Sequence, residues 1–263
     1  MSDRIKKNFQ NKNKKLVSFT TGGDPNLKMS VKIIENIINN EIDIIEIGMP
    51  FSDPMADGPT IQLSSARAIK KGVNLSHIFE IVKFARNKNK DLPIILMGYY
   101  NVILHFGIKE FVKNCKKNGV DGLIIVDLQP EEDQSLYKEL QINNIDLIRL
   151  ITPTTDERRL KSILANASGF LYYVTITGIT GQHSADINEL KESIKLIKNY
   201  TSLPIVAGFG IKNAKDVKEI CQIVDGAVVG SSIVKIIEEN QNDENRMIEL
   251  INKFTKELKK ATI

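Results

Sequence analysis

The sequence predicts an α/β protein of the (β/α)8 or TIM-barrel type, formed by a single domain that spans residues 1–263. Eight short runs rich in β-branched residues recur along the chain, and an amphipathic helical segment follows nearly every one of them. Most runs are continuously apolar, which is typical of parallel strands covered on both faces. Alternating strands and helices also fit a doubly wound open sheet, but eight strands and a length of 263 residues favour the barrel.

The expected strands share their high content of isoleucine, leucine and valine. They are residues 16–20, 42–47, 93–97, 122–126, 146–150, 169–174, 204–207 and 226–229.

The expected helices lie between these strands. Residues 27–40 place their isoleucines along one apolar face. Pro130 and the three carboxylates after it predict a helix start, because proline fits the first turn and carboxylates favour the positive end of the helix dipole. A last helix is expected at 246–260, and the lysine-rich residues 1–15 are expected to form a polar helix or arm.

Composition excludes several classes of function. The net charge of +4 comes from scattered charges and predicts no nucleic-acid binding, and no apolar run is long enough to cross a membrane. Cys115 and Cys221 are expected to be buried free thiols. His77, His105 and His183 lack metal-ligand spacing, so no metal site is expected.

Glu46 is the first candidate catalytic residue. It lies among isoleucines near the end of the second expected strand, and catalytic groups of barrels lie where strands end. A carboxylate in apolar surroundings is costly unless it is paired or used. The alternative is a glutamate whose partners lie within the core.

Asp57 is the second candidate. It belongs to the proline-rich segment 48–60, which is too long for a simple connection and is typical of a lid or binding loop. Together with Glu46 it would provide two carboxylates in different environments for acid–base chemistry. The alternative is an aspartate that forms a turn before glycine.

Glycine-rich strand ends predict a phosphate site. Gly208 and Gly210 follow the seventh strand, Gly230 and Ser231 follow the eighth, and residues 177–181 after the sixth add two further glycines. Barrels commonly hold phosphate at these strands, where glycine lets the backbone approach an anion. Glycine also simply ends strands, so each motif alone is weak.

These residues predict a barrel enzyme that acts on a phosphorylated small molecule by acid–base chemistry, without metal or nucleotide. No lysine lies in the sixth expected strand or directly at its end, which disfavours a covalent imine.

Residues 46–62, EIGMPFSDPMADGPTIQ, closely resemble the tryptophan synthase alpha family. Further similarity lies at 21–25, 97–101, 172–181 and both glycine pairs, and the resemblance runs essentially from end to end. It implies cleavage of indole-3-glycerol phosphate into indole and glyceraldehyde 3-phosphate. Other phosphate-binding barrels of tryptophan or histidine biosynthesis share the glycine sites but lack the loop 53–58.

The resemblance also implies roles for individual residues. Glu46 would be the general acid and base, and Asp57 would bind the indole N–H. Phe19, Ile61 and Tyr172 would line the indole pocket.

The same resemblance places the phosphate. It would lie on Gly181, Gly210, Gly230 and Ser231, with Gly208 and Phe209 at the same substrate site. Thr180 would help to order Asp57.

The family works with a beta subunit that carries pyridoxal phosphate and receives indole through a tunnel, in an alpha2beta2 complex. No cofactor is expected in this chain, and Asp53, Pro54 and Asn101 would face the partner. A bacterial cytosol, or a plastid stroma, is the expected compartment. Gln129, where the family pattern has proline, and Gln182 are departures that affect loop closure and partner contact. A binding subunit that only activates its partner is the remaining alternative.

Overall fold

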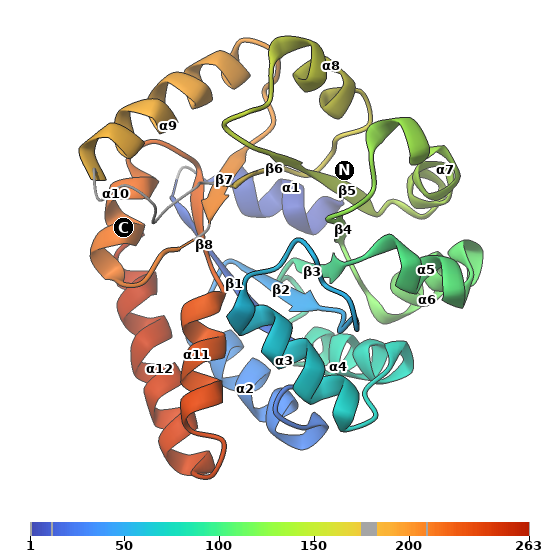
Figure 1. Ribbon diagram of the computed structural model, residues 1–263, viewed down its shortest axis with the longest axis vertical. Helices are drawn as coiled ribbons and strands as arrows, with labels where there is room; N and C mark the ends of the chain where they lie inside the picture. Colours follow the sequence, from blue (N-terminus) through green and yellow to red (C-terminus); the bar gives the residue numbers. More distant parts are fainter. Residues whose placement is uncertain (1, 12, 175–182, 209, 263) are drawn as a thin grey trace.

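Eight parallel strands close into a barrel in chain order, β1 to β8 (Figure 1). The computed structural model describes residues 2–11, 13–174, 183–208 and 210–262. The strands are β1 Lys15–Thr21, β2 Ile44–Gly48, β3 Ile94–Gly98, β4 Gly122–Ile125, β5 Asp146–Ile151, β6 Leu171–Val174, β7 Ile205–Gly208 and β8 Gly226–Val229. Because β1 pairs with both β2 and β8, the barrel is confirmed and the open sheet is excluded.

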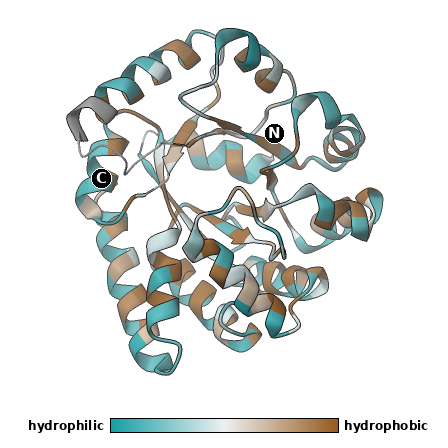
Figure 2. Ribbon diagram, in the orientation of Figure 1, coloured by the Kyte–Doolittle hydropathy of each residue, from teal (hydrophilic) through white to brown (hydrophobic). Residues whose placement is uncertain are grey.

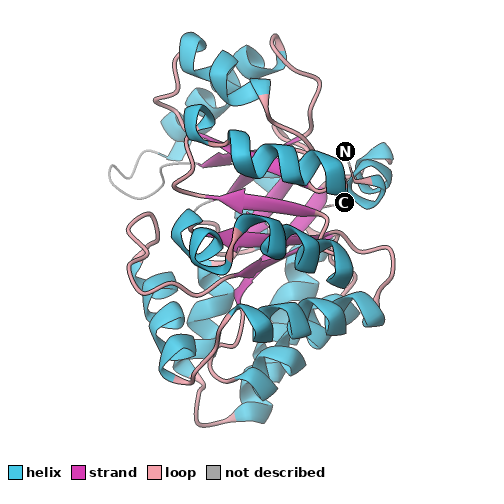
Figure 3. Ribbon diagram, turned by 90° about the vertical axis from the view of Figure 1, so that its right-hand side faces the viewer, coloured by secondary structure: helices cyan, strands magenta, loops and turns pink. Residues whose placement is uncertain are grey.

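Helices enclose the strands, as Figure 3 shows. They are α1 Asp3–Gln10, α2 Leu27–Asn39, α3 Pro59–Lys70, α4 Leu75–Lys88, α5 Tyr100–Phe106, α6 Ile108–Asn118, α7 Gln134–Asn143, α8 Glu157–Ala165, α9 His183–Lys198, α10 Ala214–Cys221, α11 Ser231–Glu239 and α12 Glu244–Lys260. Most present one hydrophobic and one hydrophilic side, which Figure 2 shows in brown and teal.

The predicted helix start at Pro130 was wrong in one respect. Pro130–Glu132 form a 3-10 turn, η1, and α7 begins only at Gln134. The Asp133 side chain does not cap α7, because it is buried against Arg149 and accepts hydrogen bonds from Asn166. A contact distant in the sequence therefore sets this helix boundary.

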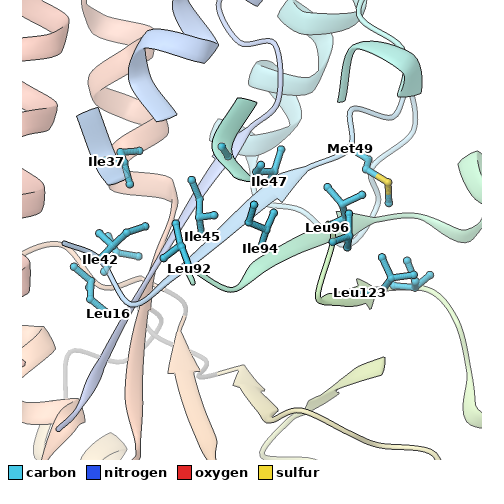
Figure 4. Packing of buried hydrophobic residues seen from close by; sticks show 14 of the residues in the cluster. Leu16, Ile37, Ile42, Ile45, Ile47, Met49, Leu92, Ile94, Leu96 and Leu123 are labelled. Atoms are coloured by element: carbon cyan, nitrogen blue, oxygen red, sulfur yellow. The ribbon is translucent and has the colours of Figure 1, made fainter. Parts of the chain in front are cut away.

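Two layers of apolar side chains hold the barrel together. The larger lies between strands and helices, and Figure 4 shows part of it, including Leu16, Ile37 and Ile45. The smaller fills the barrel interior and is built by side chains such as Val17, Ile44 and Ile95. Successive residues of one strand thus enter different layers, which explains the continuously apolar runs.

Helix α1 closes the N-terminal end of the barrel. Ile5 is fully buried in the interior cluster, and the rings of Phe9 and Phe170 lie 5.7 Å apart. The Ser2 backbone N–H donates to Asp146, at the start of β5, over 2.7 Å. The expected helix is confirmed, and it leaves the C-terminal end of the barrel for the site.

Cys115 and Cys221 are both buried free thiols, as predicted. Within the described residues no helix is long and apolar enough to cross a membrane.

Candidate active site

Glu46 lies inside the barrel, on β2, in register with Phe19 of β1 and Ile95 of β3. It is fully buried, and neither of its carboxyl oxygens has a hydrogen-bond partner among the described residues. Burial raises the pKa of Glu46 from 4.5 to about 8, because removing the carboxylate from water disfavours its charged form. This carboxyl group is therefore mostly protonated at neutral pH, and it is not the satisfied core glutamate considered above.

Asp57 is held by a tyrosine that the sequence did not single out. The Tyr99 hydroxyl donates to Asp57 Oδ2 over 3.0 Å and accepts the Ala56 N–H over 2.9 Å. The Tyr99 ring stacks on Phe51 with centroids 5.0 Å apart. Burial raises the pKa of Asp57, and the tyrosine hydrogen bond opposes this shift by stabilising the carboxylate. Tyr99, which follows β3, thus holds both Asp57 and the loop segment next to it.

Three predicted residues share one small cavity. Phe19, Asp57 and Ile61 line it together with Met49 and Met97, among others. Its volume of about 20 Å³ is far below the roughly 300–1,000 Å³ of small-molecule pockets. A ring can enter only if the lining side chains move, and the two methionines are the most adaptable of them.

Tyr172 lies near both carboxylates and also near the end of β7. Burial raises the pKa of Tyr172 well above its ordinary value, and the charges of Glu46 and Asp57 raise it further. A Cβ atom on Gly208 would lie 2.8 Å from the Tyr172 hydroxyl oxygen. The tyrosine therefore lies within electrostatic range of both acids and against the end of β7.

The predicted phosphate residues lie on neighbouring strands. Gly208 ends β7, Gly230 follows β8, and Ser231 is exposed at the first position of α11. A Cβ atom on Gly230 would lie 3.0 Å from the Phe19 Cβ atom, so a larger residue would fit only if Phe19 shifted. The free N–H groups that open α11 suit an anion.

Gly210 has a positive φ of 77°, a conformation that glycine adopts without strain. Thr180, Gly181, Gln182 and Phe209 lie outside the described residues.

Side-chain contacts connect the segment after β1 with helix α3, and α3 with α11. Asp24, fully buried, accepts two hydrogen bonds from Arg67 of α3 over 2.8 and 2.9 Å. Arg67 also pairs with Glu238 of α11 over 3.5 Å, and the Thr21 and Ser64 hydroxyls are 2.5 Å apart. Helix α3, which begins two residues after Asp57, is thereby held against α11 through Arg67 in its last turn. The sequence analysis did not name Tyr99 or Arg67 as site residues. The only feature that could have pointed to them is their position in or near the conspicuous motifs.

The residues expected to face a partner differ in exposure. Asp53 and Asn101 are exposed, whereas Pro54 is buried within this chain. Two large apolar side chains nearby in the sequence, Met55 and Leu104, are 85% and 52% exposed. The loop and α5 therefore offer apolar surface to solvent.

The Gln129 side chain accepts a hydrogen bond from Arg159, which a proline side chain could not do.

No group of three or more His, Cys, Asp or Glu side chains that could hold a metal occurs in the described part of the chain.

The chain is 43% identical over 256 residues to the tryptophan synthase alpha chain of Petrotoga mobilis, covering 97% of this chain and 98% of that one. It is 47% identical over 247 residues to that of Methanocaldococcus jannaschii, covering 94% and 87%.

Solved structures agree. Tryptophan synthase subunit alpha from Legionella pneumophila superposes with a TM-score of 0.91 at 30% identity, covering 100% of this chain and 98% of that one. The subunit from Campylobacter jejuni gives 0.85 at 38% identity, covering 98% and 99%. Residues 5–263 match the sequence family described as tryptophan synthase alpha chain, and the chain therefore belongs to that family.

Proposed function

We propose that this chain cleaves indole-3-glycerol phosphate into indole and glyceraldehyde 3-phosphate with Glu46 and Asp57 as its catalytic pair. The family consists of lyases of tryptophan biosynthesis. The observation that carries the assignment of residues is the Glu46 carboxyl group, fully buried, without a hydrogen-bond partner among the described residues and with a pKa of about 8.

Glu46 performs both proton transfers. As the acid it donates its proton to C3 of the indole ring, which leaves the ring with a positive charge shared by its nitrogen. The resulting carboxylate removes the proton of the hydroxyl group on the adjacent side-chain carbon. That carbon becomes an aldehyde, and the electron pair of the broken carbon–carbon bond returns to the ring. A pKa near 8 suits a group that must give and take a proton near neutral pH.

Asp57 acts in its charged form. Its carboxylate accepts the indole N–H and stabilises the positive charge that develops on the ring when C3 is protonated. The Tyr99 hydrogen bond supports this role, because it favours the charged form of Asp57 against the effect of burial.

The remaining predicted residues bind the substrate. Phe19, Ile61 and Tyr172 take the indole ring. The phosphate lies on Gly181, Gly210, Gly230 and Ser231, with Gly208 and Phe209 at the same site. Thr180 helps to order Asp57. The chain itself needs no cofactor or metal.

A beta subunit carrying pyridoxal phosphate receives the indole, in an alpha2beta2 complex located in the cytoplasm. Asp53 and Asn101 are exposed where this contact is proposed, and Met55 and Leu104 add apolar area. Pro54, being buried, supports the shape of the loop.

The test is indole release from indole-3-glycerol phosphate by the purified chain, alone and with a tryptophan synthase beta subunit. Slow release that rises with the beta subunit is expected, and Asp57→Asn should nearly abolish it. Activation of the beta subunit without any cleavage would instead identify a subunit that only binds.

A further inference from the structure

A second cavity lies at the C-terminal ends of β4 and β5. Its volume is about 340 Å³, within the range typical of small-molecule pockets. It shares one described lining residue, Val126, with the cavity beside Asp57. The two cavities are therefore adjacent, and apart from Val126 their lining residues differ.

The charged groups lining this second cavity are all positive. Among its described lining residues, Arg149 and Arg159 are the only charged side chains. Arg149 is 5% exposed, forms an ion pair with Asp133 and donates from Nη1 to the Leu128 carbonyl over 3.0 Å. The acid that balances Arg149 thus stands outside the cavity lining.

The buried guanidinium group of Arg149 is less well stabilised than it would be in water. Its Nε has no hydrogen-bond partner among the described residues. Burial lowers the pKa of Arg149 to about 10, and the positive charge of Arg159 contributes to this shift. An anion in the cavity would stabilise the charged form of Arg149 and so offset both burial and the repulsion from Arg159.

Arg159 occupies a more accessible position. Its side chain is 36% exposed, and it donates to Gln129 and, over 2.6 Å, to Glu131. Gln129 stands where the family pattern has proline, so this chain has a polar lining residue that proline would not supply.

Hydroxyl groups and apolar side chains complete the walls. The Thr152 hydroxyl lies 3.0 Å from that of Thr154 and 3.1 Å from that of Thr155. Each hydroxyl can donate as well as accept. Apolar side chains such as Leu150 and Ile163 line the same cavity.

We propose that this cavity binds a small organic anion at a site separate from the cleavage site. Its anionic group is recognised by Arg159 and the threonine hydroxyls, and its apolar part packs on Leu150 and Ile163. Guanidinium groups bind carboxylates with two parallel hydrogen bonds, and an apolar wall with a few polar groups is typical of ligand sites.

Calorimetric titration of the full chain with 3-phenylpropanoate tests the proposal. Saturable binding of one molecule per chain is expected, and the neutral 3-phenylpropanol should bind at least about tenfold more weakly, because hydrogen bonds to charged groups are the stronger ones. Inorganic phosphate should also bind more weakly. Equal binding of phosphate would show recognition of the head group alone and overturn the amphipathic ligand.

Arg159→Gln is the decisive variant, since this side chain is partly exposed and its loss should leave the fold intact. It should weaken 3-phenylpropanoate binding at least about tenfold. Arg158→Gln, an exposed neighbour on α8 outside the cavity lining, is the matched control and should bind normally. Circular dichroism checks that both variants are folded.

Competition separates this site from the cleavage site. Saturating glycerol 3-phosphate, directed to the proposed phosphate site, should leave 3-phenylpropanoate binding unchanged. Displacement by glycerol 3-phosphate, unaltered binding by Arg159→Gln, or no saturable binding would each overturn the inference. Indole release is measured separately and does not depend on these outcomes.

Discussion

Replacing Glu46 with glutamine should stabilise the fold at neutral pH while it removes cleavage. In the folded chain the Glu46 pKa is about 8, against 4.5 for an ordinary glutamate. Between these values the unfolded chain loses its proton more readily than the folded one, so stability falls as the pH rises. The loss is about 1.4 kcal/mol for each pH unit and reaches about 3 kcal/mol at pH 7.

Glutamine has nearly the shape of the protonated glutamate and does not titrate. The Glu46→Gln variant should therefore match the parent in stability near pH 4.5 and exceed it by up to about 3 kcal/mol at pH 7. Its cleavage rate should fall by about 10²- to 10⁴-fold, the usual contribution of a general acid–base group.

Urea denaturation followed by circular dichroism, at about pH 5 and about pH 7, measures the difference. Glu80→Gln, an exposed glutamate on α4, is the control and should change stability equally at both pH values. If Glu46→Gln had the same effect at both pH values, Glu46 would not be the buried acid described above. Undiminished indole release would remove its catalytic role.

Three further substitutions examine the surroundings of the pair. Tyr99→Phe removes the donor to Asp57, so cleavage should fall about tenfold or more, and an unchanged kcat/KM across the pH range would contradict the positioning role. Arg67→Met leaves Asp24 buried without its cation and should cost about 3–5 kcal/mol of stability in urea denaturation, and a loss below about 1 kcal/mol would contradict the pairing. Gly210→Arg adds a side chain at a positive φ beside the proposed phosphate, so KM should rise strongly, and an unaltered KM would refute the phosphate assignment.

The barrel was predictable from the sequence because its signal is local and repeated. Each strand is a short apolar run, and the observed strand ends lie within two residues of the predicted ones. Glu46 and Asp57 were equally visible, since a carboxylate in an apolar strand and an aspartate in a long loop are conspicuous in one dimension.

Features that depend on distant partners were not predictable. The role of Tyr99 could not be predicted, because its hydrogen-bond partner Asp57 lies 42 residues away in the sequence. The start of α7 was misplaced because Asp133 is drawn to Arg149 of the next strand. No rule of helix initiation contains such a contact.

The seating of α1 has a consequence for the order in which the chain can fold. Ser2 is bonded to Asp146, 144 residues away, and Ile5 is buried among side chains from all around the barrel. During synthesis the first helix therefore emerges long before its binding site exists. Its apolar face can be covered only after later strands have been synthesised, and the barrel can close only when β8 is available to pair with β1.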